Sequence, residues 1–369
     1  MSENKDHIEN SPEFKGLKVN EGVDQQEQTD NESVSRFLKK NRKLLQAEEY
    51  IKGILSGNIT ILSKAVTLVE SSKPEHQNLA QQIIVGCLAH AGNSIRIGIT
   101  GVPGVGKSTF IEALGKQITS SGGKLAVLAI DPSSERSKGS ILGDKTRMEE
   151  LAGDKNAYIR PSPSAGSLGG VARKTRETIV LCEAAGFDHI FIETVGVGQS
   201  ETAVHSMADF FLLLMLAGAG DELQGIKRGI MEMADLIAIN KADGNNFEKA
   251  QMAKSQYRNA LHLFPKKESE WEPQVLTCSS LNKNGIAEIW NKIEDYRKLT
   301  TDNNYFEIKR NEQSTFWMHE TIEERLKRDF YQHPEIKLKL KEFENRVQNN
   351  EVSSFIAAAE LLKIYKELS

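Results

Sequence analysis

The middle of the chain alternates short apolar runs with stretches of helical periodicity. The apolar runs have the length of strands, and most are bounded by turn residues; they span 95–100, 125–131, 157–160, 189–193, 210–215, 236–240 and 275–278. This alternation is typical of an α/β domain in which helices cover both faces of a mostly parallel sheet. Ligands of such sheets bind where the strands end at their carboxyl side. The pattern therefore predicts that a functional site lies at that edge.

The segments on either side of this predicted sheet domain, 93–300, have helical patterning only. Apolar residues recur every three to four positions within 36–92, and three helices with one apolar face are expected within 301–369. Helices this apolar on one face need a partner surface. We expect the helices of 36–92 to cap the sheet domain. Those of 301–369 either pack on the same domain or form a dimer arm, and the pattern leaves both alternatives open.

Residues 1–35 lack any apolar period. The segment has nine acidic and three basic residues and almost no aromatic ones. Such a segment buries too little apolar surface to offset the entropy lost on ordering. We expect a disordered tail, with a partner-binding arm as the alternative.

Composition narrows the class of protein. The 369 residues include 39% hydrophobic and 27% charged ones, and the net charge of −4 argues against a generally nucleic-acid-binding surface. The three cysteines are far apart, which excludes a disulfide framework or a zinc knuckle. The longest apolar run, 210–220, is short of the ~18 residues that a membrane-spanning helix needs. With no signal or transit sequence at its start, the chain is expected to be cytoplasmic, without nucleic-acid or membrane partners.

The strongest chemical signal is the segment GVPGVGKST at 101–109, which matches G-x-x-x-x-G-K-[ST]. It follows the apolar run IRIGIT and opens a helical stretch, as a P-loop does. Backbone amides of such a loop form a nest for phosphate oxygens, Lys107 would bridge the β- and γ-phosphates, and the Ser108 hydroxyl would bind magnesium. The fold expected is a P-loop NTPase with helical extensions at both ends. The expected nucleotide ligands here are Gly101, Val102, Pro103, Gly104, Val105, Gly106, Lys107, Ser108 and Thr109.

A second motif predicts that the base is guanine. The sequence NKAD at 240–243 follows the apolar run LIAI and matches N-K-x-D. A carboxylate can accept both N1–H and N2–H of guanine, whereas adenine offers no such pair of donors, so the wrong base leaves site groups unpaired. A serine-rich segment after the run VLTC is expected to support the base from behind. The expected base-binding residues are Asn240, Lys241, Asp243, Ser279, Ser280 and Leu281.

Acidic residues at the ends of the intervening strands predict a magnesium site. Glu193 ends the run FDHIFIE, Asp131 ends LAVLAID, and Asp144 lies 13 residues further on. Carboxylates there can bind magnesium directly, bind its waters, or orient the attacking water. Gln199 either orients that water or is an ordinary surface residue. The expected metal ligands are Ser108, Asp131, Asp144 and Glu193, and the expected catalytic residues are Lys107, Asp131 and Glu193.

Six segments occur in one order: GVPGVGKST, AIDPSSERSKGSILGDKTRM, RPSPSAGSLGGVARKT, FIETVGVGQSE, AGAGDELQGIKRGIMEMAD and NKAD. Over about residues 35–369, this set resembles the MeaB/ArgK group of G3E-type P-loop GTPases, which are relatives of the human methylmalonic aciduria type A protein. The resemblance implies a magnesium-dependent GTPase that acts as a chaperone of adenosylcobalamin-dependent methylmalonyl-CoA mutase. Such a chaperone gates cofactor loading and protects or reactivates the mutase.

The same resemblance implies further roles for individual residues. Asp131, Asp144 and Glu193 match family residues around magnesium and the γ-phosphate. The loop AGAGDELQGIKRG matches an additional switch of the family. The resemblance also implies a homodimer that forms through the carboxyl-terminal helices. The candidates for coupling to the mutase are Asp221, Glu222, Gln224 and Lys227.

The chain lacks the D-x-H-x-x-G motif that supplies a histidine ligand to cobalamin in mutases. The eight histidines are scattered, and His189 at the start of a predicted strand is interpreted as structural. We therefore expect GTP or GDP and Mg²⁺ as the cofactors of this chain, with cobalamin held by the partner mutase.

Three alternatives to this function follow from the same P-loop. A metallochaperone GTPase that delivers nickel would need cysteine or histidine ligands, but the chain has no C-x-x-C and no histidine-rich tail. A kinase or transport-coupled ATPase conflicts with N-K-x-D. A non-catalytic nucleotide-binding scaffold stays open, since turnover alone distinguishes it from a slow GTPase.

Overall fold

The computed structural model describes residues 44–131, 148–163, 168–194, 200–218 and 228–368. The chain divides into two compact units, 1–45 and 46–369, and every element named below belongs to the second. The predicted residues Asp144 and Gln199 and the coupling segment 221–227 lie outside the described residues.

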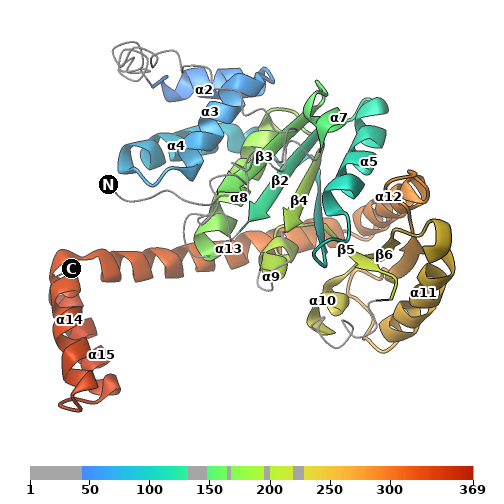
Figure 1. Cartoon of the computed structure of the whole chain (residues 1–369). Coiled ribbons are helices and arrows are strands. Elements are labelled where there is room, and N and C mark those ends of the chain that lie inside the picture. The colour runs from blue at the N-terminus through green and yellow to red at the C-terminus, as the bar shows by residue number, and fades with distance from the viewer. Residues whose placement is uncertain (1–43, 132–147, 164–167, 195–199, 219–227, 369) are drawn as a thin grey trace, which may run out of the picture. The chain divides into compact units, whose positions relative to one another are not determined.

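The centre of the second unit is a seven-stranded sheet of order β3-β2-β4-β1-β5-β6-β7 (Figure 1). All strand pairs in the described part of the chain are parallel. The strands are β1 (Ile95–Gly101), β2 (Leu125–Asp131), β3 (Ala157–Pro163), β4 (His189–Thr194), β5 (Phe210–Leu216), β6 (Leu236–Asn240) and β7 (Gln274–Thr277). The α/β fold with a parallel sheet is therefore confirmed, and each predicted strand is present.

Strand β3 extends three residues beyond its predicted end, through Pro161 and Pro163. Proline cannot donate to a ladder, so the sequence indicates a strand end there. β3 is the outermost strand and pairs only with β2 among the described strands. An edge strand tolerates proline because one of its sides has no ladder to complete.

Helices cover both faces of the sheet. One face packs in a large apolar cluster against α5 (Lys107–Ser120) and α12 (Ile286–Asp302). A second cluster joins β5 and β6 to α10 (Arg228–Met233) and α11 (Phe247–Leu261). The remaining helices within the domain are α7 (Glu149–Ala152), α8 (Leu168–Ala184) and α9 (Ser200–His205).

The amino-terminal helices α2 (Ala47–Leu55), α3 (Ile59–Glu70) and α4 (Pro74–Cys87) pack on one another and on α8. Their ends follow from local chemistry. Gly57 has a positive φ of 74°, and the Asn58 side chain accepts hydrogen bonds from the backbone N–H groups of Thr60 and Ile61. Pro74 occupies the first turn of α4, where its missing N–H costs nothing.

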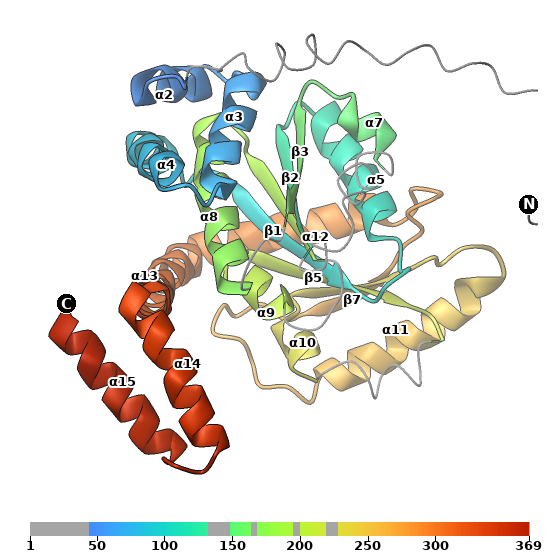
Figure 2. The same cartoon turned by 60° about the vertical axis from the view of Figure 1, so that its left-hand side comes forward.

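The carboxyl-terminal region consists of α13 (Tyr305–Gln332), α14 (Pro334–Gln348) and α15 (Ser354–Leu368). The first half of α13 packs on the sheet domain, where Arg310 and Trp317 are buried. Helices α14 and α15 lie side by side (Figure 2) and share a small apolar cluster of Phe343, Ala357 and Leu361. Packing on the domain is thus observed for the first half of α13, and the dimer arm stays a prediction. The domain boundaries at 35, 92 and 300 stay predictions.

Among the described residues, no helix is long and apolar enough to cross a membrane. The histidine interpreted as structural, His189, binds the Asp188 carboxylate at 2.6 Å and lies 5.2 Å from the Trp290 ring, at the end of the sheet where strands begin.

Candidate functional site

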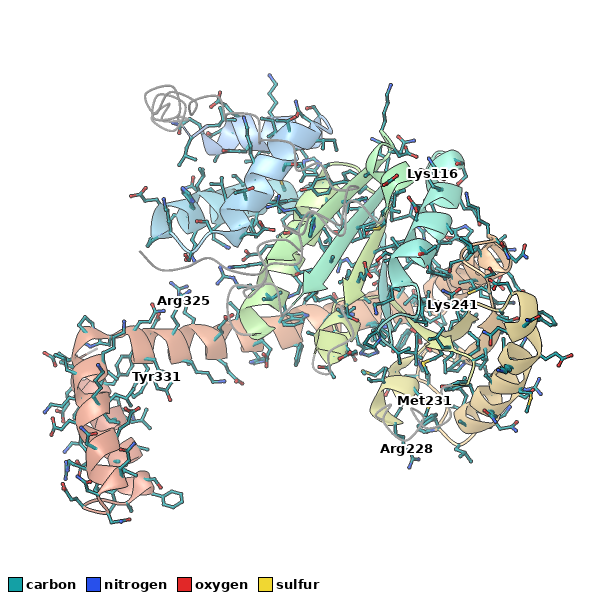
Figure 3. All side chains as sticks on the ribbon, in the orientation of Figure 1. Lys116, Arg228, Met231, Lys241, Arg325 and Tyr331 are labelled. Carbon is teal, nitrogen blue, oxygen red and sulfur yellow. The ribbon has the colours of Figure 1, made fainter. Side chains whose placement is uncertain are left out.

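The parallel register brings the predicted site residues to one edge of the sheet, which we call the carboxyl edge. Gly101 ends β1 beside Leu214 of β5, and Asn240 ends β6 beside Leu216. Glu193, near the end of β4, lies opposite Ile99 of β1. Asp131 ends β2, although its side chain lies outside the described residues. Figure 3 labels Lys241, which directly follows β6 at this edge.

The loop between β1 and α5 depends on glycine at two positions. A Cβ at Gly101 would lie 2.3 Å from the backbone oxygen of Leu214, too close for any other residue. Gly106 has a φ of 94°, which favours glycine, and immediately precedes α5. The loop therefore reaches the amino end of α5, where free N–H groups favour an anion. Ser108 and Thr109 lie in the first turn of that helix.

Lys107 folds back over this loop. Its Nζ donates to the backbone oxygen of Gly101 at 2.9 Å and to that of Val102 at 3.4 Å. Burial lowers the pKa of Lys107, while the carboxylates of Glu193 and Glu201 oppose that shift. The ammonium group is thus held on backbone oxygen atoms of the phosphate loop itself.

Asn240 joins the two nucleotide motifs to each other. Its Nδ2 donates to the backbone oxygen of Val105 at 2.8 Å, and its Oδ1 accepts from the N–H of Ser280 at 3.1 Å and from the Ser280 hydroxyl at 2.8 Å. The side chain is buried. Asn240, predicted as a base ligand, therefore directs most of its hydrogen-bonding capacity to the protein and clamps three loops together.

Within the described part of the chain, the Asp243 carboxylate accepts a side-chain hydrogen bond at one oxygen only. The Ser279 hydroxyl donates to its Oδ2, and the backbone N–H of Asn282 in turn donates to that hydroxyl oxygen at 3.2 Å. The N–H of Ala242 binds the Cys278 backbone oxygen at 2.9 Å, which fixes the loop to the end of β7. The carboxylate is therefore oriented but half-buried, with its Oδ1 available to a ligand. Leu281, predicted to support the base, is 79% exposed.

The predicted magnesium ligands are only partly described. Glu193 is buried, and next to it the hydroxyls of Thr194 and Thr100 share a hydrogen bond of 2.8 Å. Among the described side chains, no three His, Cys, Asp or Glu residues gather into a metal site. Two of the four predicted ligands, Asp131 and Asp144, are outside that set, so the predicted ligand set as a whole stays a prediction.

Sequence reasoning missed Glu201. This residue lies in the first turn of α9, is only 4% exposed, and acts electrostatically on Lys107 from there. An acidic residue in the first turn of a helix is ordinarily explained by the helix dipole. One signal could have identified Glu201: it lies two residues after Gln199, in a sequence segment that already contained candidate site residues.

Comparisons with known proteins agree with this geometry. The family model of the methylmalonyl-CoA mutase-associated GTPase MeaB matches residues 62–335. The GTPase ArgK of Escherichia coli is 50% identical over 276 residues, which cover 75% of this chain and 83% of ArgK. The mitochondrial methylmalonic aciduria type A homolog of Mus musculus is 45% identical over 324 residues, which cover 85% and 78% of the two chains.

A crystal structure of a protein titled LAO/AO transport system kinase has a TM-score of 0.70 and 38% identity to this chain. The match covers 88% of this chain and all of that one. The family resemblance drawn from the sequence motifs is thus confirmed, and so is the GTPase activity that the family model and ArgK name. The chain is a GTPase and belongs to the methylmalonyl-CoA mutase-associated GTPases of the MeaB family.

Proposed function

We propose that the chain binds GTP at the carboxyl edge, with 101–109 around the phosphates and 240–243 on guanine. The observation that carries this proposal is the Asn240–Val105 hydrogen bond, because it holds the phosphate motif and the base motif next to each other. Asp243, oriented by Ser279, presents its remaining acceptors to the N1–H and N2–H donors of guanine. Adenine lacks that pair of donors and leaves the carboxylate unpaired.

In the proposed hydrolysis, Lys107 leaves the oxygens of Gly101 and Val102 and moves to the β- and γ-phosphate oxygens. There its charge offsets the charge that develops as water attacks the γ-phosphorus in line. Mg²⁺ would be held by Ser108, Asp131, Asp144 and Glu193, and it would supply additional charge neutralisation. Glu193 and Glu201 keep the site anionic around Lys107, which favours the charged form of that lysine.

The partner that we propose is adenosylcobalamin-dependent methylmalonyl-CoA mutase, with the corrinoid held by the mutase. Support comes from the printed name of the matching family and from the methylmalonic aciduria type A homologs. The proposed role is to gate cofactor loading and to protect or reactivate the mutase. The proposed coupling residues are Asp221, Glu222, Gln224 and Lys227, in the segment that leads directly into α10.

We also propose a homodimer formed through the carboxyl-terminal arm, which we define as 326–368. An apolar groove of about 840 Å³ lies among α13, α14 and α15. Its lining includes Phe330, Phe343 and Leu361, and Tyr331 of α13 reaches it as well (Figure 3). A second copy of the arm would offer the same apolar side chains to this groove, as a self-complementary interface requires. Light scattering of the full chain tests this, and a strictly monomeric chain would contradict it.

The first experiment is GTP turnover by the purified chain, alone and with methylmalonyl-CoA mutase, with ATP as the competing substrate. GTP-selective turnover that the mutase stimulates is the expected result. Lys107→Ala measures the background, since it removes the charge that the transition state requires. Turnover that the mutase does not change would refute the proposal that the mutase is the partner. Equal use of ATP and GTP would refute the assignment of guanine as the base and favour the kinase alternative.

A further inference from the structure

A second polar cavity lies away from the carboxyl edge, between α8 and α13. Its volume is about 260 Å³, and we call it the α8–α13 cavity. It borders Ser206 and Met207, which precede β5, and Ala91 and Gly92, which precede β1. It therefore lies at the opposite edge, where the strands begin, and shares no residue with the nucleotide motifs. The side chains that characterise it are Leu88, Arg96, Arg176, Ile179, Met207, Gln313 and Trp317.

Arg176 provides this cavity with a positive charge that the described protein does not neutralise by contact. Its Cζ lies 3.8 Å from the centroid of the Trp317 ring, and its buried Nε has no hydrogen-bond partner. No described carboxylate forms an ion pair with it. Its neighbour Glu177 is occupied by Arg173 at 3.2 Å and by Gln81 at 2.9 Å.

The electrostatic surroundings of Arg176 also indicate a positive charge that the nearby carboxylates offset only in part. Burial lowers the pKa of Arg176 to about 10, and the carboxylates of Glu177, Glu324 and Glu320 offset this from a distance only in part. Arg173 on the same helix adds to the shift. A buried cation without a contact partner is costly, and a bound anion would remove that cost.

Other walls of the cavity indicate what kind of anion fits. Gln313 donates to the backbone oxygen of Ala208 at 3.0 Å and belongs to the polar part of the wall. Arg96 binds Glu183 through Nε and Nη2, so its Nη1 is not engaged in that pair. Part of the remaining wall is apolar and includes Leu88 and Ile179. A cavity with a planar guanidinium on one side and aliphatic side chains on the other suits a ligand with both characters.

We propose that the α8–α13 cavity binds a small organic carboxylate. The carboxylate lies on the Nη edge of Arg176, because a guanidinium matches the planar, two-oxygen geometry of that group. The hydrocarbon part lies against Leu88, Ile179 and Met207. Free phosphate fits less well, since it would place a fully hydrated, non-planar ion against this apolar wall.

Titration calorimetry on the nucleotide-free full chain tests the proposal with propionate, succinate, inorganic phosphate and the uncharged propionamide. Saturable binding of propionate or succinate is expected at about millimolar concentration, and none of propionamide. Arg176→Gln should weaken carboxylate binding at least about tenfold. The matched control is Lys174→Gln, which removes a charge from the same helix, lines no part of the cavity and leaves the Arg173–Glu177 pair in place, so it should bind as the unaltered chain does.

Leu88→Trp provides a variant that retains the guanidinium. Leu88 is 60% exposed, so a larger side chain there fills the cavity mouth without disturbing the core, and binding should be lost. Circular dichroism of each variant checks that it folds. Failure of every carboxylate to bind, equal binding by Arg176→Gln, or tighter binding of phosphate than of carboxylates would each overturn the proposal. None of these outcomes bears on GTP turnover, so the proposed function is tested separately.

Discussion

The two edges of the sheet are built from different interactions. At the carboxyl edge, the loops are joined by neutral hydrogen bonds in which Asn240 and serine side chains meet backbone atoms. At the opposite edge, which we call the amino edge, buried charges dominate. Arg310 of α13 donates to both carboxylate oxygens of Asp209, at 2.9 and 2.7 Å, and to the backbone oxygen of Ser94 at 2.6 Å.

This difference explains how one sheet can bind a ligand that changes at one edge and hold helix α13 in a fixed position at the other. At the carboxyl edge, the hydrogen bonds of Asn240 join neutral groups, so a shift of these loops would not strand a buried charge of that clamp. At the amino edge, any displacement of α13 would leave Asp209 buried without its partner, which is costly. Lys309 adds a hydrogen bond of 2.7 Å to the backbone oxygen of Asp209. Helix α13 is therefore attached rigidly to the start of β5.

The largest effect is expected from breaking the amino edge. Arg310→Met should lower the free energy of unfolding by about 3–5 kcal/mol, because it leaves the Asp209 carboxylate buried and unpaired. Urea denaturation followed by circular dichroism measures this. The control is Lys292→Met in the surface pair with Asp295, where the change should stay below about 1 kcal/mol. Equal effects of the two variants would remove the proposed contrast between buried and surface charges.

Breaking the clamp at the carboxyl edge should have a smaller effect. Asn240→Ala removes the partner of the Val105 oxygen and of the Ser280 N–H, and should cost about 2–3 kcal/mol of unfolding free energy. GTP affinity should fall as well, since the two motifs are no longer joined. The half-buried Asn246 side chain, which donates to the Lys241 oxygen at 2.8 Å, offers a matched Asn→Ala control for stability. A loss of affinity without loss of stability would show that Asn240 acts as a ligand rather than a clamp.

The pH dependence of stability tests the effect of one buried titratable group near the amino edge, apart from the ion pair of Arg310. Burial lowers the pKa of His205 in α9 to about 4, and the nearby charge of Lys309 adds to the shift. The unfolded chain binds this proton near pH 6.5, so stability should fall as the pH drops from about 6.5 to 4, on the order of 1–3 kcal/mol. Denaturation of the unaltered chain and of His205→Gln across this pH range measures the contribution of His205 to the free energy of unfolding. Parallel curves for the two proteins would contradict the prediction.

The smallest effect on stability is expected from Asp243→Asn. The side chain is half-buried and the replacement keeps its shape, so the free energy of unfolding should change by less than about 0.5 kcal/mol. GTP affinity should nevertheless fall about a hundredfold, because the amide cannot accept two hydrogen bonds from guanine. Competition between GTP and ATP measures the preference. An unaltered preference would disprove the role given to Asp243.

Local sequence patterns were sufficient to predict the strands of the sheet and the two nucleotide-binding motifs. The P-loop context follows from an apolar run, two glycines with special geometry and a helix start, all within 95–118. The clamp by Asn240 could not be predicted from the sequence, because its partner Val105 is 135 residues away along the chain and no local pattern encodes such a contact. Glu201 was missed for a different reason, since a helix-capping role explains the same residue type.

Helix α13 shows where hydrophobic patterning fails. The apolar pattern predicts a helix around Phe316–Phe330, yet the helix begins at Tyr305. Its early turns attach to the domain through polar groups of Lys309, Arg310 and Gln313, which leave no apolar stripe in the sequence. The partner residues, 208 and 209, are about a hundred positions away, so the charge pairing has no local signature either.

The clamp by Asn240 has a mechanical consequence. Its hydrogen bonds to Val105 and Ser280 lie within the protein and join the base loop to the phosphate loop. A displacement of one loop is therefore transmitted to the other through one buried side chain. In the proposed complex, the two ends of the nucleotide would be held by parts of the protein that move as a unit rather than independently.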